Sequence, residues 1–294
     1  MAGQMGIIEA ERKVKRMLQG QGILAEEMAA SPILFGYVLL ILFILGTVMG
    51  SFLTCYAGRF ITRESVLKGR SHCDACGHVL GAGDLIPVVS YLALKGRCRY
   101  CGSRISPRCV VTELLMGALF DAGLLRYGLR FSLLCYLVLV CILLALSLID
   151  LDTCLIPDRF HLAAIVNRAA CLPLIVWEQS GKTGFRAALL SASAKSLLTG
   201  AVTAAVMLLA SLLFDRITGK ESMGGGDIKL YFVTGLYLAG WSAYLCVILS
   251  CIIGLLTAAC MKKHKIPFGP SIAAALVLCL LFGDDVIRWY LGLF

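Results

Sequence analysis

Two short segments of this 294-residue chain carry aspartates of the kind that hydrolytic chemistry uses. The second of them reads Met223-Gly-Gly-Gly-Asp227-Ile-Lys229, where three glycines let the backbone approach a substrate closely while Asp227 is presented. The first, between residues 147 and 158, holds Asp150, Asp152 and Asp158. Two carboxyl groups placed together do not both ionise easily, so one keeps a proton and acts as an acid while the other activates water. The two segments therefore contain the groups needed for aspartyl hydrolysis.

The three acids of the first segment have different expected roles. Asp150 is nearest to the preceding apolar run, and Asp152, two residues further on, points to a different side of the helix. Asp158 follows Pro157 and precedes the next apolar run, so we expect it to act as a helix N-cap. The glycine segment, taken alone, is read equally well as an ordinary flexible loop.

Four cysteines form a second constellation. The chain reads Cys73-Asp-Ala-Cys76 and, after 21 further residues, Cys98-Arg-Tyr-Cys101, with Gly77 and Gly102 following the two pairs. Two such pairs can place four thiolates tetrahedrally about one zinc ion, and four cysteine ligands leave no open position for water. We therefore predict a structural zinc site, the alternative being a pair of redox units or idle thiols. The remaining ten of the 14 cysteines are expected to be mainly small core residues on apolar helices.

The composition shows what kind of protein must position these groups. Hydrophobic residues make up 59% of the chain and charged residues only 15%, which excludes a single water-soluble globule. Apolar runs of roughly 20 residues cross a bilayer as helices, and the chain has several. We predict an all-α polytopic membrane protein with about eight transmembrane helices and a cytoplasmic tetracysteine loop. The expected spans are Ile33 to Tyr56, Val110 to Leu125, Phe131 to Ile149, Phe160 to Trp177, Leu197 to Phe214, Leu230 to Ala239, Ser242 to Met261 and Ile272 to Phe294.

The distribution of basic residues predicts the orientation. Residues 57–108 hold nine lysines and arginines against three acids, and positively charged loops remain cytoplasmic. With eight spans, the segments around Asp150 and Asp227 lie on that same side and both termini lie outside. The net charge of +9 is thus a topology signal rather than a sign of nucleic-acid binding.

These motifs, in this order, resemble the bacterial type IV prepilin leader peptidase and N-methyltransferase family, which are GxGD intramembrane aspartyl proteases. The resemblance extends from Met49-Gly-Ser-Phe-Leu to Ile266-Pro-Phe-Gly-Pro270, and is particularly close from Asp84 to Cys101 and around Met223-Gly-Gly-Gly-Asp227. It implies removal of a short basic leader from prepilins or pseudopilins at the cytoplasmic face of the inner membrane. It also implies S-adenosylmethionine-dependent methylation of the new N-terminus, an activity associated with the cysteine loop.

By this match Asp150 and Asp227 are the catalytic pair, supported by Asp152, Gly224, Gly226 and Lys229, and the metal ligands are Cys73, Cys76, Cys98 and Cys101. The implied partners are the substrate proteins and membrane lipid. The expected division is a polar tail at 1–31, a first transmembrane helix at 32–56, the tetracysteine loop at 57–109 and the peptidase domain at 110–294.

The chain departs from the family pattern beside the cysteine loop. Thr54 stands where the family usually has Asn, Cys109-Val110 replaces Tyr-Pro, and Thr112 precedes Glu113, which we expect to pair with a loop arginine. A peptidase without methyltransferase activity is therefore the alternative function. A transporter with an aspartate ion relay is a more distant one, because relay acids tend to lie in the middle of a span.

Overall fold

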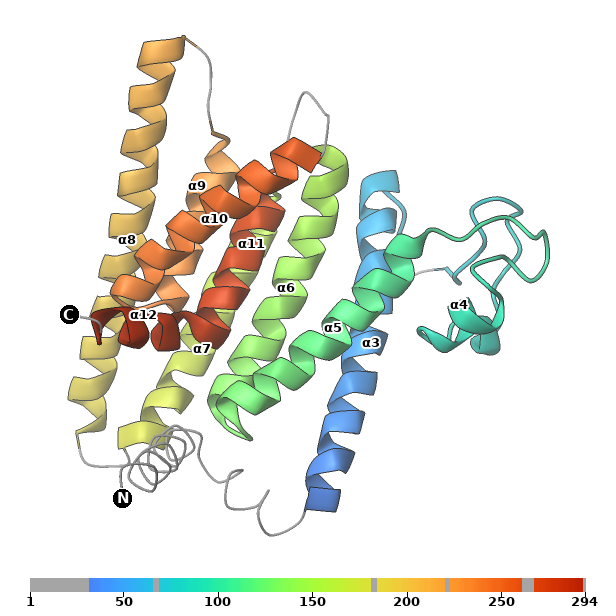
Figure 1. Cartoon of the computed structure of the whole chain (residues 1–294), viewed down its shortest axis with the longest axis horizontal. Helices are drawn as coiled ribbons and strands as arrows, with labels where there is room; N and C mark the ends of the chain where they lie inside the picture. Colours follow the sequence, from blue (N-terminus) through green and yellow to red (C-terminus); the bar gives the residue numbers. More distant parts are fainter. Residues whose placement is uncertain (1–31, 66–68, 181–183, 220–222, 261–266, 293–294) are drawn as a thin grey trace, which may run out of the picture.

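The computed structural model describes residues 32–65, 69–180, 184–219, 223–260 and 267–292, and the expected tail at 1–31 lies outside them. The described residues form a bundle of helices joined by short connections, with a long loop between the first two long helices (Figure 1). The helices are α3 (Pro32–Thr62), η1 (Ala82–Asp84), α4 (Val89–Ala93), α5 (Pro107–Tyr127), α6 (Phe131–Thr153), α7 (Asp158–Ser180), α8 (Phe185–Thr218), α9 (Gly225–Tyr237), α10 (Trp241–Cys260), α11 (Gly269–Leu278), η2 (Cys279–Gly283) and α12 (Asp284–Leu291).

Six helical stretches of the described chain are long and apolar enough to cross a membrane. They are Ile33–Thr62, Phe131–Thr153, Asp158–Ser180, Phe185–Thr218, Trp241–Cys260 and Gly269–Leu291. The other two expected spans are also helical, but α5 carries four charged residues and α9 has only 13 residues. The prediction of an all-α polytopic membrane protein is confirmed.

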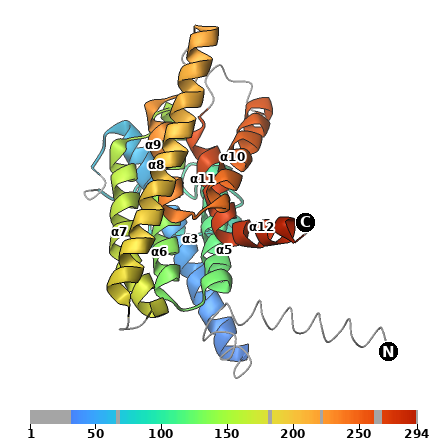
Figure 2. The ribbon, with the colours of Figure 1, turned by 90° about the vertical axis from the view of Figure 1, so that its left-hand side faces the viewer.

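Two helices differ from the expected spans. α8 begins at Phe185, 12 residues before the expected Leu197, because residues 185–196 are good helix formers although they are too polar for an apolar run. The last expected span is bent, since α11 passes through a π-helical turn, η2, into α12. α12 projects sideways from the bundle (Figure 2).

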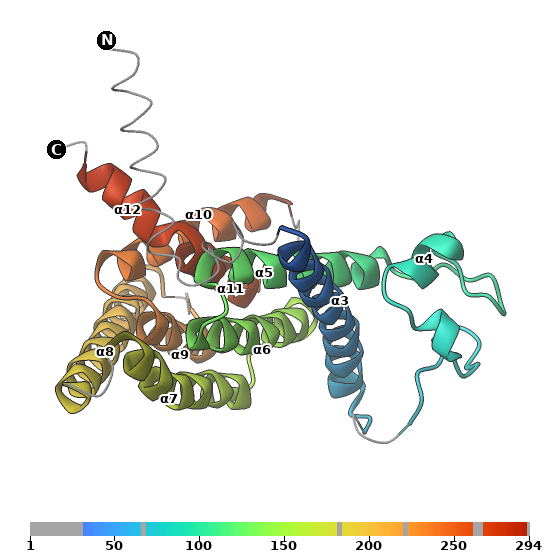
Figure 3. The same cartoon turned by 90° about the horizontal axis from the view of Figure 1, so that it is seen from below.

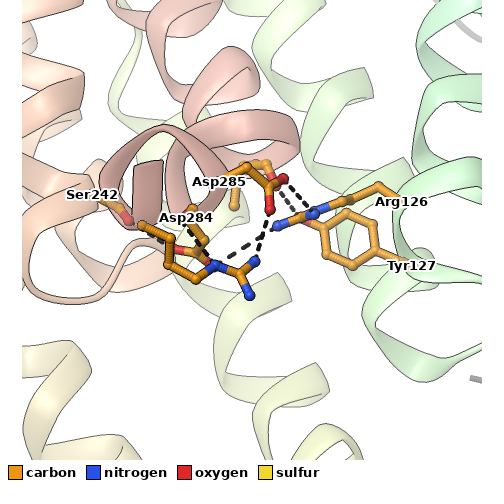
Figure 4. A network of polar contacts seen from close by, with 7 residues as sticks. Arg126, Tyr127, Ser242, Asp284 and Asp285 are labelled. Atoms are coloured by element: carbon orange, nitrogen blue, oxygen red, sulfur yellow. Dashed lines mark hydrogen bonds and ion pairs between the residues drawn. The ribbon is translucent and has the colours of Figure 1, made fainter. Parts of the chain in front are cut away.

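Polar contacts hold this bend in place (Figure 4). A π-helical turn disturbs the regular backbone ladder, and the Tyr127 hydroxyl donates a hydrogen bond of 2.9 Å to the Leu280 carbonyl there. Arg126 forms an ion pair of 2.8 Å with Asp285, and the Ser242 hydroxyl donates to Asp284 over 2.8 Å. Side chains of α5 and α10 therefore bind the start of α12.

α3 and α5 approach each other closely because their contact surface is made of small residues. A Cβ built on Gly46 would lie 2.6 Å from the Met116 carbonyl oxygen, and one on Gly50 would lie 2.8 Å from that of Thr112. The Gly46-to-Gly50 spacing is the small-residue pattern that lets membrane helices pack backbone to backbone. The two helices that flank the cysteine loop are thus held together at the base of the loop.

α6 is the centre of the bundle and contacts α3, α5, α7 and α11 (Figure 3). Its buried side chains include Leu139, Leu146 and Ile149. α9 is fixed in a different way, because the Gly235 backbone packs against Gly200 of α8. Near the end of α9, the Leu236 carbonyl also accepts a hydrogen bond of 2.9 Å from the Arg168 Nε atom. Both helices that carry the aspartate motifs are therefore rigidly held.

Candidate active site

The aspartate motifs lie at one end of the bundle, where α6 ends and α7, α9 and α11 begin (Figure 1). Asp150 occupies the last turn of α6, and Asp227 the first turn of α9. The Asp150 carboxylate is near enough to act electrostatically on Asp227. The structure thus brings together two carboxyl groups that are 77 positions apart in the chain.

Asp150 is held by the beginning of α11. Its side chain is only 3% exposed, and the Gly269 N–H donates a hydrogen bond of 2.9 Å to its Oδ2 atom. A Cβ built on Gly269 would lie 2.6 Å from that oxygen and 2.9 Å from the Ile156 Cδ1 atom. A larger residue at position 269 would therefore displace the Asp150 carboxylate, and the hydrogen bond leaves the Oδ1 atom available for other partners.

Asp227 is presented by the glycine segment. Gly224 precedes the helix with an extended backbone, and its carbonyl accepts a hydrogen bond of 3.0 Å from the Asp227 N–H. Ile156, in the turn between α6 and α7, packs against the third glycine of the segment, since a Cβ on Gly226 would lie 3.3 Å from the Ile156 Cβ. Ile156 thus lies between Gly226 of α9 and Gly269 of α11.

Side chains in the first turn of α7 bind the same segment of α9. His161 is 4% exposed, and its Nε2 atom lies 3.0 Å from the Gly226 carbonyl oxygen. Lys229 Nζ binds Asp158 Oδ1 at 2.6 Å. We expected Asp158 to be the N-cap of this helix, but it is the first residue of α7, and the hydrogen bond that its carboxylate forms joins two helices.

Asp152 lies apart from the pair. It is exposed, and the Arg108 Nη1 atom lies 2.8 Å from each of its carboxylate oxygens. The Arg108 Nη2 atom donates to the Leu148 carbonyl at the same distance. Arg108 therefore ties the beginning of α5 to the end of α6, and Asp152 acts with it as a link between these helices.

The expectation that Glu113 pairs with a loop arginine is wrong. Glu113 is 6% exposed, and its Oε2 atom accepts a hydrogen bond of 2.7 Å from the Val88 N–H. Val88 is the residue before α4, with a φ of +62°, and its N–H has no acceptor within the helix because it precedes the first turn. This contact could not be predicted from residue spacing, because Val88 and Glu113 are 25 positions apart in the chain.

The tetracysteine loop consists of two similar turns. Its four Sγ atoms all lie within 4.8 Å of one another, and those of Cys73 and Cys101 are 3.9 Å apart. Zinc–sulfur bonds of about 2.3 Å in a tetrahedron place sulfur atoms about 3.8 Å apart. Gly77 and Gly102, with φ of +70° and +71°, close the two turns. The four cysteines can therefore hold a metal ion with little movement.

The loop backbone also favours thiolates at two of these positions. N–H groups of Cys76 and Ala75, followed by the Ser103 hydroxyl, lower the pKa of Cys73 to about 6. The Ser103 hydroxyl and N–H likewise lower the pKa of Cys101. The His78 N–H lowers the pKa of Cys76, but partial desolvation and the neighbouring thiols of Cys101 and Cys73 outweigh it and raise this pKa to about 11. Such crowding of thiols is relieved when a cation binds them.

Two residues of the site had no role assigned by sequence reasoning. Gly269 lies within the segment Ile266-Pro-Phe-Gly-Pro270, whose prolines signal a helix start but not a bond to Asp150. His161 lies three residues after Asp158, on an apolar helix that offered no sign of a contact with Gly226. Both contacts depend on which helices are neighbours in space.

Comparison with known proteins places the chain among related sequences. Residues 44–127 match the family model described as the bacterial peptidase A24 N-terminal domain, and residues 137–259 match that of the type IV leader peptidase family. No solved structure matches the chain significantly.

Curated relatives cover most of the chain. A protein of Bacillus subtilis named prepilin leader peptidase/N-methyltransferase is 33% identical over 86% of this chain and 98% of its own length. A protein of the same name from Aeromonas hydrophila is 37% identical over 77% of this chain and 76% of its own length. One from Pseudomonas aeruginosa is 36% identical over 75% of this chain and 74% of its own length. The chain therefore belongs to the type IV leader peptidase family.

Proposed function

We propose that this chain is a prepilin leader peptidase in which Asp150 and Asp227 hydrolyse the leader junction. The observation that carries the proposal is that Asp150, at the end of α6, and Asp227, at the beginning of α9, lie at the same end of the bundle, where Ile156 packs against both Gly226 and Gly269. Both aspartates stand in terminal turns of their helices, as a protease at a membrane boundary requires. Residues 110–294 would then form the peptidase domain.

The mechanism follows from the pair. Because neighbouring carboxyl groups resist double ionisation, one carries a proton and the two titrate as a unit. The ionised carboxylate accepts a proton from a water held between them, and the resulting hydroxide oxygen bonds to the scissile carbonyl carbon. The protonated carboxyl then protonates the leaving amine as the peptide bond breaks. The Gly269 N–H keeps Asp150 Oδ2 in place, so that its Oδ1 atom can bind the water.

The orientation is part of the proposal. The end of α3, both ends of the tetracysteine loop and the aspartate pair lie at the same end of the bundle (Figure 1). The basic residues of this loop support a cytoplasmic location for that end. The apolar helix of a prepilin would lie in the bilayer, with its leader junction at the carboxyl groups and both termini of the enzyme outside.

We also propose that the enzyme methylates the new N-terminus, as the names of its relatives suggest. S-adenosylmethionine would supply the methyl group. The two acids near α4 already have partners in this structure, because Asp84 binds Arg99 and Glu113 accepts a hydrogen bond from the Val88 N–H. We therefore assign no residue of this part of the chain to the methyl donor.

The function is tested by co-expressing a prepilin with this protein and weighing the pilin by mass spectrometry. We expect the mass of the pilin to fall by the mass of the leader. Methylation of the new N-terminus should then add about 14 Da. Removal of the leader without this increment would support the peptidase and contradict the methyltransferase. A pilin that keeps its leader would contradict both.

We propose that the metal held by the four cysteines is a structural zinc ion, which would join the two turns of the loop. The purified full-length protein is expected to contain about one zinc per chain, and Cys73→Ser should reduce this to a small fraction. Cys55→Ser is the matched control, because Cys55 is an exposed thiol on α3 outside the cluster. A low zinc content that Cys73→Ser leaves unchanged would refute the assignment.

A further inference from the structure

The short helix α4 of the tetracysteine loop and the segment just before it expose four large apolar side chains. Leu85, Ile86, Val89 and Leu92 are 43%, 49%, 58% and 66% exposed, and we refer to them as the α4 apolar face. α4 is held in place within the loop, because the Tyr91 ring packs against Gly96. The Gly96 N–H also donates a hydrogen bond of 2.9 Å to the Tyr91 carbonyl. The apolar face is therefore a fixed feature of the loop, and it needs a partner.

The position of α4 along α5 indicates what this partner is. The Val88 N–H, immediately before α4, binds Glu113, the seventh residue of α5. At about 1.5 Å per residue, this contact lies about 9 Å along α5 from its first residue. Figure 1 accordingly shows α4 alongside α3 and α5 rather than beyond their ends, and Figure 3 shows it projecting away from the other helices.

The neighbouring helices α5 and α3 also expose large apolar side chains at this level. Val111, Leu114 and Leu115 of α5 are 58%, 43% and 46% exposed, on the helix that also carries Glu113. Phe52 of α3, next to the residues that pack on Thr112, is 52% exposed. The α4 apolar face thus continues a surface that the transmembrane bundle presents to the bilayer.

The basic side chains around α4 favour lipids with anionic headgroups. Among the described residues of the loop from 69 to 106, four exposed cations have no ion-pair partner: Arg70, Lys95, Arg97 and Arg104. The acid Asp84 is already neutralised by Arg99, which leaves Asp74 as the exposed acid of this stretch. Clusters of basic residues next to a membrane bind anionic lipids. A basic prepilin leader, by contrast, would be repelled by them.

We propose that α4 is an interfacial anchor, in which the α4 apolar face enters the cytoplasmic leaflet and the surrounding cations bind anionic headgroups. The anchor would hold the tetracysteine loop flat against the membrane, next to the beginning of α5. Its partner is the lipid surface itself, so the proposal does not depend on the peptidase or methyltransferase activity.

A photo-crosslinking experiment tests this contact in the full-length protein. The protein is placed in nanodiscs of phosphatidylcholine with or without phosphatidylglycerol, with p-benzoylphenylalanine replacing Leu92 or, as a control, the exposed Asp74 between two cysteines. Lipid adducts, counted by mass spectrometry, are expected to be at least about fivefold more frequent at position 92 than at position 74. Equal frequencies at the two positions, or adducts at position 92 only with an added prepilin, would overturn the proposal.

The charge component has its own measurement. In mixed nanodiscs, phosphatidylglycerol should make up a larger share of the adducts at position 92 than of the lipid supplied. A combined Lys95→Gln and Arg97→Gln change should reduce this share to that of the supplied mixture while adducts persist. Hydrogen exchange of residues 85–94 in the unmodified chain, expected to be slower in mixed nanodiscs than in pure phosphatidylcholine, provides a readout without any substitution. An identical exchange rate in both would argue against anionic headgroups as the partner.

Discussion

Asp227→Asn is expected to abolish leader cleavage while the protein still inserts into the membrane. The amide keeps the shape of the side chain but neither shares the proton of the pair nor accepts one from water. General acid–base catalysis contributes about 10²- to 10⁴-fold, so the rate of cleavage should fall by at least that amount, and Asp150→Asn should do the same. Because the two groups act as one unit, the double variant should be little slower than either single variant.

Asp152→Asn is the internal control, because Asp152 lies two residues from Asp150 on the same helix but faces Arg108. An exposed ion pair stabilises a protein by no more than about 1 kcal/mol, so cleavage should fall by less than about tenfold. All three variants would be purified, checked for helix content and assayed on the same prepilin. Cleavage that survives Asp227→Asn but is lost with Asp152→Asn would refute the assignment of the catalytic pair.

Gly269→Ala should cause the second large loss, although the residue carries no side chain. Its methyl group would lie 2.6 Å from the Asp150 Oδ2 atom and 2.9 Å from the Ile156 Cδ1 atom, so the Asp150 carboxylate and the Ile156 side chain must shift. Overpacking of this kind destabilises a protein by about 1–3 kcal/mol. A displacement of about 1 Å at a catalytic group can lower a rate by about 100-fold, so activity should suffer more than stability.

Two further glycines provide a graded comparison. A Cβ on Gly225 would meet no atom within 4 Å, whereas one on Gly226 would lie 3.3 Å from Ile156. The order of remaining cleavage should therefore be Gly225→Ala, then Gly226→Ala, then Gly269→Ala, with thermal unfolding measured on each. If Gly269→Ala cleaves as well as Gly225→Ala, the Gly269 N–H does not position Asp150.

Several parts of the fold and site follow from local pattern. Apolar runs longer than a bilayer's thickness identify the membrane helices, because no water is available there for unpaired backbone groups. The spacing of Cys73, Cys76, Cys98 and Cys101 predicts a cluster for a similar reason, since each pair closes a tight turn of fixed geometry. Helix ends were less predictable, as the early start of α8 and the bend before α12 show. Hydropathy indicates which residues lie in the membrane, but it does not indicate which hydrogen bonds extend a helix beyond it or bend the helix.

The amino-acid sequence by itself determined that this protein is a helical membrane protein, that four cysteines form one cluster, and that Asp150 and Asp227 belong to the motifs of an aspartyl peptidase. The first two properties depend on residue types at short spacing, for which chain geometry is sufficient, and the third is what the resemblance to the peptidase family implies. Only the tertiary structure decided that Gly269 binds Asp150, that His161 reaches Gly226 and that Glu113 serves Val88 rather than an arginine. Those contacts join helices distant in the chain, and they depend on the packing of side chains in three dimensions, which no local pattern encodes.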